Sequence, residues 1–187
     1  AEKEQSAKKF DKRKRLTEEL LETEKSYVQA LAIVNEVFMI PLKSTHKHLL
    51  NENQFSQIFS DIESVHKVNA AFLEALEKLF EKPEFYDNVE RELGLLFSTR
   101  AATFKQYTKY VNHYENADAV MHQCIKSNRK FAEFLDNCGL DLTAKKFRQS
   151  DLGSFLIMPI QRLPRYNLLS SDILKSTELK PTAVGYT

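Results

Sequence analysis

The sequence contains few residues that interrupt a helix. Its 187 residues include four glycines and five prolines, and 28% of them are charged. Segments of alternating, β-branched residues, which would predict a sheet, do not recur along the chain. The length is sufficient for one hydrophobic core. These observations predict an all-α fold, an elongated bundle of long helices that forms a single domain over 1–187.

Cysteine and long apolar segments are also scarce. Cys124 and Cys138 are the only cysteines and form no CxxC pattern, so a free, reduced pair is the simplest interpretation. The sequence shows no signal peptide and no apolar run near the roughly 20 residues that span a bilayer. These features predict a cytoplasmic protein.

Motifs of enzymatic chemistry are missing as well. The sequence has no glycine-rich phosphate loop, no serine nucleophile elbow and no HExxH. His46 and His48 form an HxH, but no acidic or cysteine cluster accompanies them, so solvated loop histidines are favoured over a metal site. We therefore expect no cofactor, no metal and no covalent chemistry.

Positive charge is concentrated at the start of the chain, although the net charge is only +1. Residues 1–15 include seven Lys or Arg and three acidic residues. A solvated first helical turn is the favoured interpretation, and an arm that binds nucleic acid or lipid is the alternative. Aromatic interleaving and nucleic-acid motifs are both missing, so no nucleic-acid partner is expected.

The spacing of the apolar residues predicts long helices over 8–40, 52–80, 89–110 and 117–135. Pro41 is expected to end the first helix, and Asn51 or Asn53 to cap the second. The segment HYENAD (113–118) is expected to be a short connection. Gly139 is expected to terminate the fourth helix.

The segment FLIMPIQRLPRYNLLSSDIL (155–174) has helical spacing, yet it contains Pro159 and Pro164. A proline inside a helix removes a backbone hydrogen bond and costs about 3 kcal/mol. The two prolines leave the carbonyls of Phe155 and Ile160 without their usual donors and predict a bend. The Arg162 side chain is a candidate donor to such a carbonyl.

Two faces of this segment differ in chemistry. One face is apolar and consists of Leu156, Ile160, Leu163 and Leu174. The other is mostly polar but includes a large leucine, and consists of Gln161, Arg165, Leu168 and Asp172. An ordinary solvent face is one interpretation. A partner surface with an arginine and an apolar anchor at its centre is the other.

The first helix contains a carboxylate in an unusual place. Glu24 lies four residues after Leu20 and three before Tyr27, within or beside the apolar stripe. One interpretation from spacing alone is a flank carboxylate that forms a salt bridge with an arginine at the edge of the core, and a role in binding is the other.

Three segments resemble the conserved regions of the Dbl-homology domain, the exchange domain of Rho-family GTPase activators. They are LLETEKSYVQAL (20–31), FSQIFSDIESVHKVNAAFLEALE (55–77) and LGSFLIMPIQRLPRYNLLSSDILK (152–175). The resemblance covers about 10–177, and PIQRLPRY followed by LL is its most specific part. It implies an elongated helical bundle that binds both switch regions of a Rho, Rac or related small GTPase. Such a domain stabilises the nucleotide-free form, so that GDP leaves and GTP enters.

The resemblance also implies roles for single residues. Glu24 corresponds to the family glutamate that touches switch I, and Gln161 and Arg165 correspond to the pair that contacts switch II. Ile157 and Leu168 fall at positions that help to choose among GTPases. Asp172 shares the face of Gln161 and Arg165 and is included in the expected GTPase-binding set.

The sequence departs from the family at its end. The family has a further long helix after the third region, whereas the segment 178–187 is expected to be an irregular tail, so the last helix is expected to be truncated. A non-exchanging helical scaffold or a self-associating interaction domain is therefore the alternative function. Contact with a membrane is expected only through other domains, with recruitment to membrane or cytoskeleton in the full-length protein.

Overall fold

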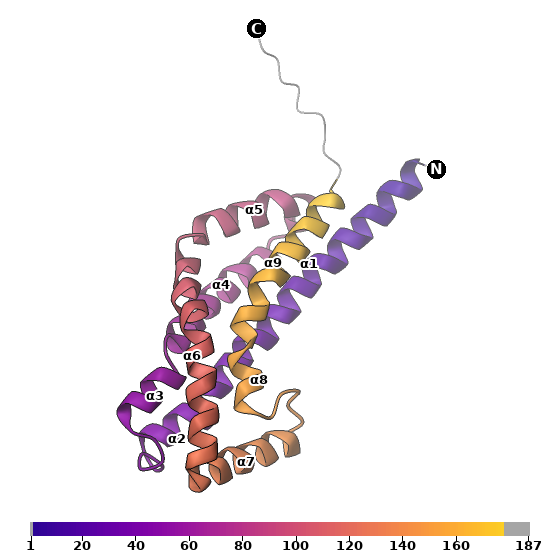
Figure 1. Cartoon of the computed structure of the whole chain (residues 1–187). Coiled ribbons are helices and arrows are strands. Elements are labelled where there is room, and N and C mark those ends of the chain that lie inside the picture. Colours follow the sequence, from indigo (N-terminus) through magenta and orange to yellow (C-terminus); the bar gives the residue numbers. More distant parts are fainter. Residues whose placement is uncertain (1, 178–187) are drawn as a thin grey trace.

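The computed structural model describes residues 2–177, and every regular element in that range is helical. The all-α prediction is confirmed, while the expected irregular tail at 178–187 lies outside the described residues. Figure 1 shows an elongated bundle in which α9 lies along α1, with α4 and α6 beside them. The α-helices are α1 (Glu2–Ile33), α2 (Ile40–Lys43), α3 (Glu52–Ile58), α4 (Ile62–Phe80), α5 (Val89–Arg100), α6 (Gln106–Ser127), α7 (Arg129–Ala144), α8 (Leu152–Leu156) and α9 (Met158–Lys175).

The first helical segment continues beyond its predicted end. A π-helical stretch, η1 (Val34–Met39), follows α1 and leads directly into α2. Ile40 donates its backbone N–H to the carbonyl of Asn35, five residues earlier. Pro41 lies in the first turn of α2, where its missing N–H is tolerated. The prediction that Pro41 ends the helix was therefore wrong.

The predicted helix over 52–80 is two helices. Asn51 caps α3 by accepting from the backbone N–H of Gln54, as one of the two predicted caps. The chain then breaks after Ile58, and Asp61 adopts a left-handed conformation with φ 59°. Apolar spacing continues across this break, which is why the sequence suggested one helix.

The predictions for the middle of the chain were wrong at four points. The predicted helix over 117–135 is divided between α6 and α7 at Asn128, which caps α7. The segment 89–110 is divided between α5, a 3₁₀ turn η3 (Thr103–Lys105) and α6, while HYENAD lies inside α6. Gly139 lies inside α7 and does not end it. A Cβ at this position would approach the carbonyl oxygen of Ser150 to 2.9 Å. Gly139 therefore permits close contact with the segment that leads to α8.

The two prolines of 155–174 have different positions. Pro159 lies in the first turn of α9, after the chain breaks at Ile157, so it costs no helical hydrogen bond. Pro164 lies inside the helix. The buried residues follow one stripe through both α8 and α9, beside the predicted apolar face, and are Phe155, Pro159, Arg162, Tyr166, Leu169 and Ile173. Leu174, predicted on the apolar face, lies off this stripe and is 56% exposed.

Two hydrophobic clusters form the core. One surrounds the fully buried rings of Phe38, Phe131 and Phe155. The other includes Phe72 and Tyr166, whose rings meet edge to face at 5.7 Å. Together they fix α9 against α1 and α4, which sets the position of the outer face of α9.

Candidate functional site

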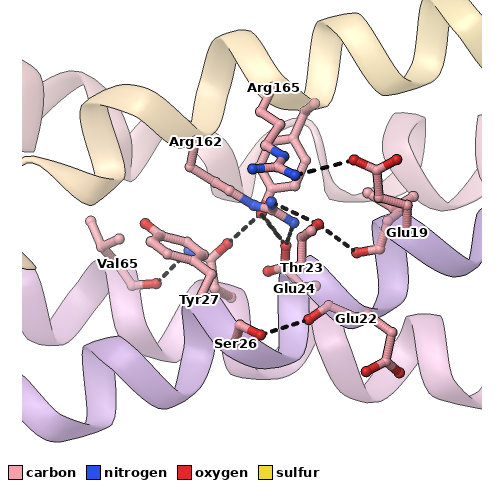
Figure 2. Close-up of polar contacts among 12 residues, drawn as sticks. Glu19, Glu22, Thr23, Glu24, Ser26, Tyr27, Val65, Arg162 and Arg165 are labelled. Atoms are coloured by element: carbon pink, nitrogen blue, oxygen red, sulfur yellow. Dashed lines mark hydrogen bonds and ion pairs between the residues drawn. The ribbon is translucent and has the colours of Figure 1, made fainter. Parts of the chain in front are cut away.

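A buried ion pair joins α1 to α9. Glu24 is fully buried, and its Oε2 atom accepts from Arg162 Nε at 3.1 Å and Nη2 at 2.5 Å. Tyr166 Oη donates to the same oxygen at 2.7 Å. Arg162 Nη1 donates to Thr23 Oγ1 at 3.1 Å, which completes the link across the helices (Figure 2). Arg162 thus bonds side chains of α1, and the suggested bond to a carbonyl freed by proline was wrong.

The hydrogen bonds continue from this pair into the core. Tyr166 Oη lies 2.9 Å from Asn69 Oδ1, and Asn69 Nδ2 donates to Tyr107 Oη at 2.7 Å. Tyr107 and Tyr27 share a hydroxyl–hydroxyl bond of 2.9 Å. Burial raises the pKa of the Glu24 carboxyl above its ordinary value of 4.5, and Arg162 and Tyr166 oppose this shift.

The outer face of α9 is exposed beside this pair. Gln161 and Arg165 are exposed, Leu168 is 65% exposed and Asp172 is half-buried. Arg165 Nη2 lies 3.1 Å from Glu19 Oε1 on α1, and both side chains are about half exposed (Figure 2). This ion pair is accessible to solvent, so a partner can replace it at low cost.

A cleft of about 480 Å³ lies between α1, α9 and the segment before α8. Gln161, Arg162 and Arg165 line one side of it, and Lys146 and Arg148 line another. Both of these residues are exposed, and neither forms an ion pair within residues 2–177. Neither residue was among the predicted site residues, although the basic run KKFR (145–148) is a visible signal in the sequence.

Ile157 lies outside the cleft that Gln161 and Arg165 line. It is half-buried at the junction of α8 and α9 and lines a depression of about 780 Å³ shared with α6 and α7. The structure therefore brings together Gln161 and Arg165, with Leu168 and Asp172 farther along the same helix. It does not bring Ile157 into their cleft.

Glu24 is the predicted site residue whose environment differs most from a docking surface. It pairs with an arginine, as the salt-bridge interpretation from spacing predicted, but the pair is fully buried and does not lie at the edge of the core. A contact between Glu24 and a GTPase remains a proposal, and it requires the side chain to leave Arg162.

We also considered metal sites, membrane-spanning helices and the cysteines. Among residues 2–177 no group of three or more His, Cys, Asp or Glu side chains is placed to hold a metal, and no helix there is long and apolar enough to cross a membrane. His46 packs against the ring of Phe134 at 4.9 Å. Cys124 and Cys138 are free thiols.

Comparison with known proteins agrees with the family resemblance of segments 20–31, 55–77 and 152–175. The model of the RhoGEF domain matches residues 16–183. The chain belongs to the RhoGEF domain family. Guanine exchange factor for Rac 30 of Dictyostelium discoideum is 36% identical over 171 residues, which cover 89% of this chain and 9% of that protein. Human Rho guanine nucleotide exchange factor 4 is 29% identical over 176 residues, which cover 93% of this chain and 24% of that protein.

Solved structures show the same fold. A structure of the Vav1 exchange factor superposes on this RhoGEF domain with a TM-score of 0.79 and 25% identity, covering 91% of this chain and 43% of that chain. The DH/PH domains of PDZ-RhoGEF, in a complex with activated RhoA, give a TM-score of 0.77 at 18% identity, covering 93% and 48%. The all-α bundle is therefore a RhoGEF-domain fold.

Proposed function

We propose that this RhoGEF domain binds the switch regions of a Rho-family small GTPase and promotes GDP release and GTP loading. The observation that carries the proposal is the exposed row Gln161, Arg165 and Leu168 on α9, fixed beside α1 in a domain of this family. The domain would act by binding the nucleotide-free GTPase more tightly than the loaded one, with no covalent step of its own.

The chemistry of the surface indicates what it would meet. Arg165, Lys146 and Arg148 line one cleft and favour acidic groups on the GTPase. Leu168 supplies an apolar anchor on the face that it shares with Asp172. Ile157, in the neighbouring depression, would act on GTPase choice from a second contact area. We place this activity in the cytoplasm, with recruitment to membrane or cytoskeleton through other parts of the full-length protein.

Self-association without exchange is the second candidate function. An apolar cleft of about 460 Å³ lies between α5 and α9, with Leu93, Phe97 and Leu174 in its lining. Leu174 is more than half exposed at its edge. Exposed apolar surface of this kind is found at protein contacts, so the oligomeric state of the chain bears on this alternative.

Leu168→Ala is expected to weaken binding to the nucleotide-free GTPase about 5- to 30-fold, because it truncates the apolar anchor of the proposed surface. The melting temperature should stay within about 2 °C, since the Leu168 side chain is 65% exposed. The matched control is Leu95→Ala on α5, where the leucine is 60% exposed. Affinities are measured by biolayer interferometry. Equal affinities for the two variants and the wild type would show that the GTPase does not bind at Leu168.

A further inference from the structure

One oxygen of the Glu24 carboxylate has no hydrogen-bond partner among residues 2–177. Oε2 receives all three hydrogen bonds from Arg162 and Tyr166, whereas Oε1 is buried without any within the described part of the chain. Buried polar atoms are normally paired, and an unpaired one in a native protein requires an explanation. The enclosed position of Glu24 is thus incompletely satisfied.

The hydroxyl group of Tyr166 has a choice of acceptors. It carries one hydrogen atom, yet it lies 2.7 Å from Glu24 Oε2 and 2.9 Å from Asn69 Oδ1. The orientation of Asn69 is fixed, because its Nδ2 donates to Val65 O and to Tyr107 Oη. Tyr166 can therefore transfer its hydrogen bond from Glu24 to Asn69 without being left unpaired.

Arg162 also has alternatives to Glu24. Its Nη1 donates to Thr23 Oγ1, and its guanidinium lies 4.5 Å from the ring of Tyr166 and 5.5 Å from that of Tyr27. Arg162 and Thr23 both line the cleft between α1 and α9, although the Arg162 side chain is only 4% exposed there. Both groups that hold Glu24 therefore keep another contact when they release it: Arg162 keeps Thr23 and the tyrosine rings, and Tyr166 keeps Asn69.

We propose that these contacts form a latch, which we define as Glu24 held by Arg162 and Tyr166, and that the latch opens when the GTPase docks. Opening turns Glu24 toward the cleft, where the GTPase pairs with the carboxylate and Tyr166 donates to Asn69. Tyr166 is then a positioning residue that sets the balance between the closed and open forms. This inference rests on the proposed exchange function.

The latch has a measurable consequence for binding. If docking requires the open form, the apparent affinity for the GTPase is reduced by the fraction of molecules that are open. A change that weakens the closed form, while leaving the docking face intact, should therefore increase activity. A merely structural role for the same contacts predicts no gain.

Tyr166→Phe tests the latch, because it removes the hydroxyl from Glu24 and keeps the packed ring. The control is Tyr110→Phe, which removes the bond from another buried tyrosine hydroxyl to the Leu156 carbonyl, outside the latch. Nucleotide release from the GTPase is timed with the 187-residue chain. We expect Tyr166→Phe to raise kcat/KM about fivefold and Tyr110→Phe to change it less than twofold. In the Glu24→Gln background, Tyr166→Phe should change it less than twofold.

Arg162→Lys repeats the test with the charge kept and the two-pronged contact removed, and an increase is again expected. Melting temperatures of all variants confirm that the compared chains are folded. If the wild type is active and neither Tyr166→Phe nor Arg162→Lys exceeds it, the latch is wrong while the exchange function stands. If the wild type accelerates release from no Rho-family GTPase, the exchange function fails, and the latch fails with it.

Discussion

Arg162→Met is expected to lower the free energy of unfolding by about 3–5 kcal/mol, because it leaves the Glu24 carboxylate buried without its cation. For a chain of this size the melting temperature should fall by about 6–20 °C. Thermal and urea unfolding followed by circular dichroism measure the change.

Two comparisons isolate the ion pair. Arg165→Met removes the solvent-exposed pair with Glu19 and should cost no more than about 1 kcal/mol. Adding Glu24→Gln to Arg162→Met removes the uncompensated charge and should recover part of the lost stability. An Arg162→Met chain as stable as the wild type would contradict the buried ion pair that joins α1 to α9.

Arg165→Glu is expected to slow nucleotide exchange at least about 30-fold, which corresponds to about 2 kcal/mol. The reversed charge would place a carboxylate at the centre of the proposed docking face, facing Glu19 and the acidic groups expected on the GTPase. Nucleotide release is measured with a fluorescent GDP analogue.

The control for this substitution is Arg91→Glu on α5, an exposed arginine that does not line the cleft beside α9. It changes the net charge of the chain equally and should alter the rate less than twofold. Similar losses in the two variants would indicate a general electrostatic effect and would remove Arg165 from the proposed contact.

The features that the sequence predicted correctly depend on local patterns. The scarcity of glycine and proline, with apolar stripes, was sufficient for an all-α bundle, and Asn51 was recognisable as a cap. The exposed face of α9 follows from helical spacing within one segment. The segment PIQRLPRY placed the chain near its family.

The features that were missed depend on contacts between distant segments. From the sequence, Gly139 is typical of a residue that ends a helix. In the structure it leaves room for the Ser150 carbonyl, which lies in a distant segment. HYENAD is polar because it lies within a helix that is partly exposed, so its composition resembles that of a loop. The burial of Glu24 depends on Arg162, 138 residues later in the chain, and spacing could suggest an arginine partner without identifying it.

We propose that this RhoGEF domain accelerates nucleotide exchange on a Rho-family GTPase through the outer face of α9. The most direct measurement times the release of a fluorescent GDP analogue from a panel of purified Rho, Rac and related GTPases, with increasing concentrations of the chain. We expect release from at least one GTPase to become faster in proportion to the concentration of the chain, and Arg165→Glu to reduce this acceleration at least about 30-fold. Release at the intrinsic rate from every GTPase, in the presence of a folded chain, would contradict the account.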